Sequence, residues 1–286
     1  MIVQLILFSI SLAMVYFVLS AGFSLIFGLM DVLNYAHASF VMWGAYFTYF
    51  AYQRTGSFIL GLLIGIAVGV AVGTAIEVFL IRNIRGDQTN QLLLTFGLIY
   101  IMNELVKIFF GTSTIFPNRP ALFQKSIPMG DLVFPVYRLI LIIMGVVVYI
   151  LLMLLINKTR LGMTIRAGTE NPKMVRACGI NIRNIFTMSF GIGIFLAALG
   201  GGLACFFLGL YPDLANDQLF NILVIVIIGG VGSIQGTFVA SILIGLTQYF
   251  VGYYFPVLSM AASMILMVII LIIKPTGLFK AGASNE

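Results

Sequence analysis

The sequence predicts an all-α fold, a polytopic bundle of transmembrane helices, and three observations support this prediction. The chain of 286 residues is 61% hydrophobic and only 8% charged, whereas a soluble domain carries roughly a quarter charged residues. Most of the apolar residues lie in runs long enough to cross a bilayer, which takes about 20 residues of helix. No stretch longer than about 30 residues departs from this pattern, so we expect residues 1–286 to form a single transmembrane domain.

The individual spans follow from the apolar runs and from the turn residues between them. We expect about eight spans, at residues 3–27, 38–53, 58–80, 90–110, 136–156, 184–208, 218–254 and 257–273. The segment 218–254 contains no charged residue, but the glycine-rich sequence GGVGSIQG interrupts it at 229–236. This segment is therefore either one broken or re-entrant helix or a pair of helices, which would add one span.

The positive charges set the orientation of the chain. The longest polar loop, at 157–184, contains one acidic residue, Glu170, and these basic residues: Lys158, Arg160, Arg166, Lys173, Arg176 and Arg183. The positive-inside rule places such a loop in the cytoplasm. Because successive spans alternate in direction, we expect the C-terminus in the cytoplasm and the N-terminus outside. The net charge of +6 lies mainly in loops beside the spans, so membrane lipid headgroups explain it better than a nucleic acid does.

Glycines recur at intervals of four inside two of the apolar runs, in GLLIGIAVGVAVG at 61–73 and in GIGIFLAALGGG at 191–202. Small residues at this spacing let helix backbones approach closely in lipid. We expect them to pack helices within the subunit. A contact between subunits or the lining of a pathway are the alternatives.

Two polar or glycine-rich interruptions stand out at membrane depth. The first, GLMDVLNYAHASF at 28–40, places Asp31, Asn34 and the only histidine, His37, three residues apart. The second is the break at 229–236, and the sequences that follow the two breaks, ASFV and GTFV, are alike in residue type. Interrupted helices that meet near the midplane are the usual build of transport proteins. The candidate pathway residues are Asn34, His37, Gly229, Gly230, Gly232 and Ser233, and a simple junction between helices is the alternative.

A short helix is predicted inside the basic loop, at 172–178. Asn171 can cap its start, Pro172 suits the first helical position, and Gly179 can adopt the left-handed conformation that ends a helix. Composition alone favours a solvated turn or a helix lying on lipid headgroups. The alternative is a lever that a soluble partner grips to move the spans on either side.

Several ordered motifs resemble those of one family, the permease subunits of branched-chain amino acid ABC importers of the LivH type. They are SLIFGLMDVLNYAHASFVMWGAY at 24–46, IEVFLIRNIRG at 76–86, LTFGL at 94–98, TRLGMTIRAGTENPKMVRACGIN at 159–181 and GGVGSIQGTFVAS at 229–241. The resemblance implies that the loop at about 158–183 carries the coupling helix, which docks on an ATP-binding subunit. The coupling residues it implies are Arg166, Glu170, Asn171, Pro172, Lys173, Arg176 and Gly179.

The resemblance also implies the partners and the location of the chain. They are a second homologous permease, two cytoplasmic ATP-binding subunits and an extracytoplasmic (periplasmic) substrate-binding protein, in a bacterial inner membrane. ATP and Mg would be bound by the partner subunits, and we expect no cofactor in this chain. Three departures from the family pattern, at Ala38, Ser39 and Asn83, leave the fold prediction intact but keep urea, short amides and other small organic solutes open as substrates.

Few side chains could carry chemistry of their own. The sequence has no phosphate-binding loop with its lysine, no metal-ligand cluster and only one histidine, so we expect a transport component and not an enzyme. Glu77 is predicted to anchor a cytoplasmic loop through Arg82 or Arg85, and Glu104 to pair locally with Lys107. A proton-coupled transporter that uses Glu77, Glu104 and His37, or a channel subunit, is the alternative of another class.

Overall fold

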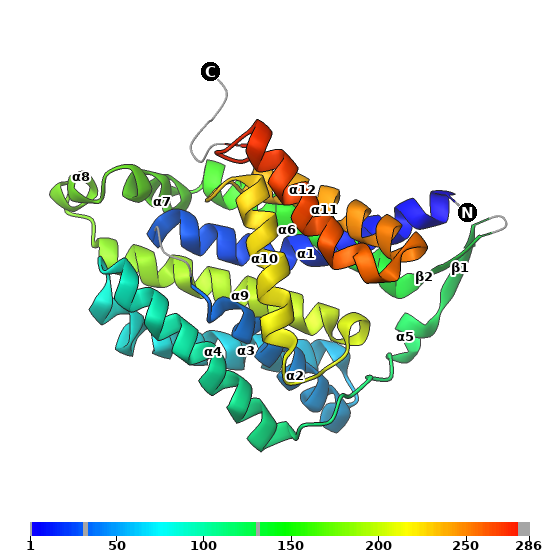
Figure 1. Cartoon of the computed structure of the whole chain (residues 1–286). Coiled ribbons are helices and arrows are strands. Elements are labelled where there is room, and N and C mark those ends of the chain that lie inside the picture. Colours follow the sequence, from blue (N-terminus) through cyan, green and yellow to red (C-terminus); the bar gives the residue numbers. More distant parts are fainter. Residues whose placement is uncertain (1, 31–33, 130–131, 280–286) are drawn as a thin grey trace.

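The all-α prediction is confirmed by the computed structural model, which describes residues 2–30, 34–129 and 132–279 (Figure 1). The helices are α1 (Ile2–Met30), α2 (His37–Thr55), α3 (Phe58–Phe79), α4 (Gln88–Phe110), α5 (Ala121–Gln124), α6 (Val136–Lys158), α7 (Arg160–Glu170), α8 (Pro172–Ala177), α9 (Ile182–Leu208), α10 (Leu214–Gly229), α11 (Ile234–Tyr254) and α12 (Ser259–Ile273). Single 3₁₀ turns lie at Ile81–Ile84 and Pro256–Leu258, and an antiparallel hairpin pairs β1 (Ser126–Met129) with β2 (Leu132–Pro135).

Six helices within the described residues are long and apolar enough to cross a membrane, so the chain is a multi-pass membrane protein. They are α1, α4, α6, α9, α11 and α3 with its 3₁₀ extension. The prediction of about eight spans also included α2 and α12. The apolar part of α12, Ala261–Ile273, is shorter, and α2 carries several polar side chains, including Thr48, Gln53 and Arg54.

The predicted broken segment 218–254 forms two separate helices, α10 and α11. Helix α10 begins earlier than predicted, at Leu214, and has 16 residues, about 24 Å of helix, which is less than the thickness of a bilayer core. Figure 1 shows α10 crossing the direction of α1 and α9. Between the two helices Gly230 and Gly232 have φ values of 95° and 75°, which L side chains rarely adopt.

Helices α1 and α9 form the centre of the bundle. They are the most deeply buried of the six candidate spans, while α3 and α6 expose most of their length. Glycines make the central contacts possible, as predicted. A Cβ atom on Gly65 would lie 2.9 Å from the Gly44 carbonyl oxygen in α2, and one on Gly69 would lie 2.9 Å from the Ala198 Cβ in α9. The glycine spacing therefore packs helices within the subunit.

The polar segments gather at opposite ends of the bundle. Figure 1 shows α7 and α8 at one end, and the N-terminus, α5 and the β1–β2 hairpin at the other. This arrangement agrees with the parity predicted for the loops at 157–184 and 111–135. The sequence pattern did not predict α7, α5 or the hairpin, which are short elements in polar surroundings. Both cysteines are free, Cys178 exposed and Cys205 buried.

Candidate functional site

The basic loop folds into a capped two-helix unit, α7 and α8. The Thr159 hydroxyl accepts a hydrogen bond from the Gly162 N–H (3.1 Å) at the start of α7. The Asn171 side chain accepts one from the Met174 N–H (3.0 Å) at the start of α8, with Pro172 in the first turn. Gly179 follows with φ 78°. The predicted capping of the short helix is confirmed.

One side of this unit is packed against the bundle and the other side is exposed. Ile165 of α7, Val175 of α8 and Ile182 of α9 are buried, and a Cβ atom on Gly168 of α7 would lie 3.7 Å from the Ile182 Cδ1 atom, so α7 packs against the start of α9. Among the predicted coupling residues, Lys173, Arg176 and Gly179 are exposed, and the half-buried Arg166 donates to the Asn157 side chain (3.4 Å). Asn171 caps α8, while Glu170 ends α7 and Pro172 begins α8. The exposed side carries basic groups that can meet an acidic partner surface.

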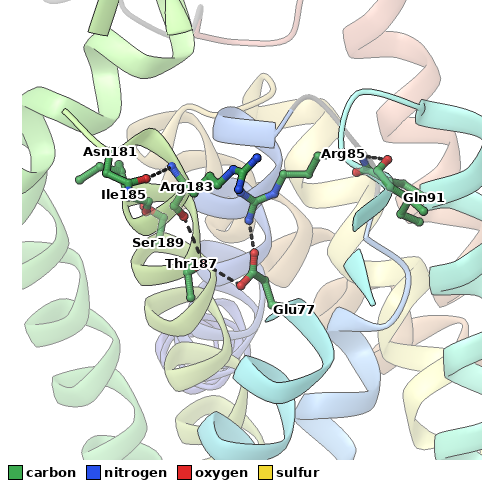
Figure 2. Close-up of polar contacts among 9 residues, drawn as sticks. Glu77, Arg85, Gln91, Asn181, Arg183, Ile185, Thr187 and Ser189 are labelled. Atoms are coloured by element: carbon green, nitrogen blue, oxygen red, sulfur yellow. Dashed lines mark hydrogen bonds and ion pairs between the residues drawn. The ribbon is translucent and has the colours of Figure 1, made fainter. Parts of the chain in front are cut away.

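A buried carboxylate lies where α3 and α9 meet, close to this unit (Figure 2). Glu77, in the last turn of α3, forms an ion pair with Arg85. Its second oxygen accepts a hydrogen bond from the Thr187 hydroxyl of α9 (2.7 Å). The side chain of Glu77 is fully buried. The predicted anchoring role is confirmed in its geometry, and of the two predicted partners the structure selects Arg85.

The charges around this carboxylate are mostly positive. Burial lowers the pKa of the Arg85 guanidinium, while the Glu77 carboxylate acts to raise it and Arg82 and Arg183 lower it further. The guanidinium also lies over the Phe186 ring, 4.8 Å from its centroid. Glu77 therefore pairs with one of three arginines whose charges act on one another here, Arg82, Arg85 and Arg183.

The first predicted interruption lies at the junction of α1 and α2. His37 is fully buried, its Nε2 lies 3.1 Å from the Leu19 carbonyl oxygen, and its ring packs edge-on against Phe23. Asn34 is 5% exposed, and its side-chain amide has no hydrogen-bond partner among the described residues. Asp31, the third member of the polar stripe, lies outside the described residues.

The second interruption contacts the first. A Cβ atom on Gly28, near the end of α1, would lie 2.6 Å from the Gly232 Cα, so the two breaks touch through glycine backbones. Ser233 caps α11 by accepting a hydrogen bond from the Gly236 N–H (3.1 Å).

Gly229 and Gly230 face another part of the chain. The Gly229 carbonyl accepts a hydrogen bond from the Phe279 N–H (3.1 Å), and a Cβ atom on Gly277 would lie 2.6 Å from the Gly230 Cα. Contacts with the C-terminal segment therefore account for Gly230, whereas close packing on α11 accounts for Gly229, since a Cβ atom there would lie 2.7 Å from the Gly236 carbonyl oxygen. Of the predicted pathway residues, Asn34 alone is buried with both of its side-chain polar atoms unpartnered.

Two further results concern ionisable and polar groups. Glu104 and Lys107 form the predicted local ion pair, with 2.7 Å between Nζ and the carboxylate oxygen. Thr187 was not predicted to take part in any site, and nothing in its local sequence distinguishes it, since it meets Glu77 only through the packing of α9 on α3.

The chain is a bundle of apolar helices in which two interruptions touch, and a basic, capped extension lies at one end. These features define a membrane protein of the transporter class. A family model described as "Branched-chain amino acid transport system / permease component" matches residues 5–274. The chain belongs to this family.

Individual relatives agree with the family assignment. The chain is 25% identical to BraD, a permease protein of the high-affinity branched-chain amino acid transport system of Pseudomonas aeruginosa, over 92% of this chain and 91% of that protein. It is 22% identical to the LivH permease protein of Escherichia coli strain K12, over 94% and 92% of the two chains. A solved structure, PsaBC from Streptococcus pneumoniae in complex with Fab, has a TM-score of 0.53 with 12% identity and covers 96% of this chain and 95% of that one. This structural likeness shows the fold alone.

Proposed function

We propose that this chain is the permease subunit of an ATP-driven ABC importer and that it forms part of the pathway for branched-chain amino acids. The family match over residues 5–274 carries this proposal, and the names of BraD and LivH supply the substrate class. Urea, short amides and other small organic solutes remain the alternative substrates, because Ala38 and Ser39 depart from the family pattern at buried positions in the first turn of α2, close in sequence to Asn34.

The importer would contain partners that this chain does not supply. They are a second homologous permease, two cytoplasmic ATP-binding subunits that bind ATP and Mg, and an extracytoplasmic substrate-binding protein. The complex would lie in a bacterial inner membrane with the lipid headgroups beside the basic loop. The end with α7 and α8 faces the cytoplasm, the N-terminus lies outside and the C-terminus lies inside, as the positive-inside rule favours.

The α7–α8 unit is proposed as the coupling element. ATP binding would close the pair of ATP-binding subunits and displace α8, and the exposed Lys173 and Arg176 would meet acidic groups on the partner. Substrate released by the binding protein would then pass between the permeases. Asn34 is the pathway residue that the geometry supports best, because a passing polar solute or water could satisfy its unpartnered amide.

A proton-coupled transporter receives no support from the contacts of Glu77 and Glu104. Glu77 is bonded to Arg85 and Thr187, and Glu104 is bonded to Lys107. Each carboxylate thus already has an ion-pair partner.

The test is ATP-driven uptake of leucine by the purified complex in proteoliposomes. Arg176→Glu, or deletion of residues 172–178, should leave the membrane fold intact and abolish substrate-stimulated ATP hydrolysis together with uptake. Lys125→Glu, a charge reversal at an exposed site in the loop assigned to the outside, is the matched control. Normal uptake in the Arg176→Glu complex would refute the coupling role of α8, and failure of the wild-type chain to co-purify with ATP-binding subunits would refute the importer assignment.

A further inference from the structure

A single carboxylate continues the glycine stripe of α3. The buried positions of this helix are Gly61, Gly65, Gly69, Gly73 and Glu77, one every four residues. Residues four apart share one face of a helix, and this face packs on α2 and α9. Four positions allow close backbone contact, whereas the fifth places a charged group in the contact between helices. Ionisable groups at such depth are expensive and mark a specific use.

Two consecutive residues of α9, Phe186 and Thr187, contact Arg85 and Glu77 respectively. The Thr187 hydroxyl donates to one oxygen of Glu77 at 2.7 Å. Arg85 pairs with the other oxygen while its guanidinium lies 4.8 Å from the centroid of the Phe186 ring. Figure 2 shows the Glu77 carboxylate between Arg85 and Thr187, with a separate segment of chain on each side.

On one side, the cluster is connected to α8. Only residues 178–181 separate the end of α8 from the start of α9. Val175 and Ile182 are both buried there, and the Ile180 N–H donates to the Val175 carbonyl (3.3 Å). Because this connection is short and hydrogen-bonded to α8, a displacement of α8 acts directly on the first turn of α9.

On the other side, the cluster is connected to α4. The Gln91 side chain in the first turn of α4 is buried and donates to the Ile84 carbonyl (2.9 Å), next to Arg85. The start of α4 is thus tied to the α3–α4 turn, and through Arg85 to Glu77. Apolar helix contacts in lipid have no directional preference and can slide, whereas hydrogen bonds and ion pairs depend on direction as well as distance. Both carboxylate oxygens of Glu77 have such a partner, although the Arg85 Nε atom is buried without one among the described residues.

We propose that Glu77, Arg85 and Thr187 form a positioning relay that carries the displacement of α8 to the ends of α3 and α4. The start of α9, the end of α3 and the start of α4 then move as one body when the ATP-binding subunit moves α8. This inference rests on the proposed function for the identity of α8 as the coupling element, but none of the relay residues belongs to α7 or α8.

The deciding variant is Thr187→Val, which replaces the hydroxyl with a methyl group of similar size. It removes the bond to Glu77 together with a bond to the Arg183 carbonyl in the same helix (3.1 Å). In the reconstituted complex with all its partners, ATP hydrolysis should continue while leucine uptake per ATP hydrolysed falls about two- to thirtyfold, the range expected when a coupling network loses one link. Thr187→Ser keeps the hydroxyl and should restore the ratio. Thr247→Val is the matched control, because among the described residues the Thr247 hydroxyl bonds only to the Leu243 carbonyl within its own helix (2.8 Å).

A distance measurement separates a relay from a merely structural bond. Spin labels on the exposed Cys178 and on Leu93→Cys in α4, an exposed position, report whether the two ends move together. In the otherwise wild-type chain, the distribution of distances between the two labels should stay narrow when ATP is added. It should broaden in the Thr187→Val chain but not in the Thr247→Val chain. The relay proposal is wrong if the Thr187→Val complex shows wild-type uptake per ATP hydrolysed and a narrow distribution of label distances.

The two proposals fail in different ways. If the wild-type complex shows no ATP-driven uptake, the proposed function fails before any relay variant is made. If Arg176→Glu uncouples the complex but Thr187→Val does not, the importer assignment stands and the relay is wrong. Glu77→Ala is less informative, since it leaves Arg85 buried without its partner and can prevent folding.

Discussion

At the scale of single residues, Asn34 and His37 illustrate how neighbouring polar groups in one turn take different roles. The His37 ring fills the space beside Gly22, since a Cβ atom on Gly22 would lie 3.0 Å from the His37 Cε1, and its Nε2 meets the Leu19 carbonyl. The amide of Asn34 has no such partner among the described residues. The histidine therefore joins α2 to α1, whereas no hydrogen bond to the described residues holds the Asn34 side chain, in keeping with the pathway role proposed for it.

Alanine substitution should separate these two roles. His37→Ala leaves a cavity and an unpaired carbonyl, so we expect the free energy of unfolding to fall by about 2–4 kcal/mol, with less assembled complex. Asn34→Ala removes no hydrogen bond between described residues, so stability should change by less than about 1 kcal/mol while the rate of uptake changes. Thermal unfolding in detergent measures the first effect, and uptake normalised to assembled complex measures the second. Equal stability of the two variants would contradict the assignment.

At the scale of elements, the segment that follows α12 forms hydrogen bonds with the break between α10 and α11. The Leu278 N–H donates to the Ile228 carbonyl (2.8 Å), and the Phe279 N–H donates to the Gly229 carbonyl (3.1 Å). These are carbonyls at the end of α10, which lack partners within the helix. The segment following α12 thus supplies hydrogen bonds that α10 cannot make for itself.

Truncation tests this dependence. A chain that ends at Thr276 should lose about 1–3 kcal/mol of stability for each buried carbonyl left unpaired, and the α10–α11 turn should exchange amide hydrogens faster. A chain that ends at Phe279 keeps both bonds and is the matched control. The idea is wrong if the two truncated chains unfold at the same temperature and exchange alike in this turn.

The elements also show which features the sequence could predict. The cap at Asn171 and the stop at Gly179 were predictable because each depends on residues within a few positions, and the glycine stripe was predictable because its period is that of the helix. Glu77 could be recognised as costly, but Arg82 and Arg85 were equally plausible partners until the turn at Ile81–Ile84 was known. The Thr187 contact and the crossing of α10 depend on packing between distant segments, which no local pattern reveals.

At the scale of the whole molecule, the orientation of every loop follows from one assignment. Successive spans alternate in direction, so the side on which α8 lies determines the sides of both termini and of the β1–β2 hairpin. Cys178 reports on this side directly, because it is exposed just after α8, whereas Cys205 is 1% exposed within α9.

A membrane-impermeant maleimide should therefore label the chain in inside-out vesicles and fail to label it in intact cells. Cys178→Ser should abolish labelling, since the remaining cysteine is buried, and bound ATP-binding subunits should slow the labelling of Cys178 if they cover α8. Mass spectrometry of the labelled peptide identifies the modified residue. Labelling of Cys178 from the outside would show that the complete topology is the reverse of the one assigned. It would also exclude the coupling role of α8, because an ATP-binding subunit can reach only the cytoplasmic end of the bundle.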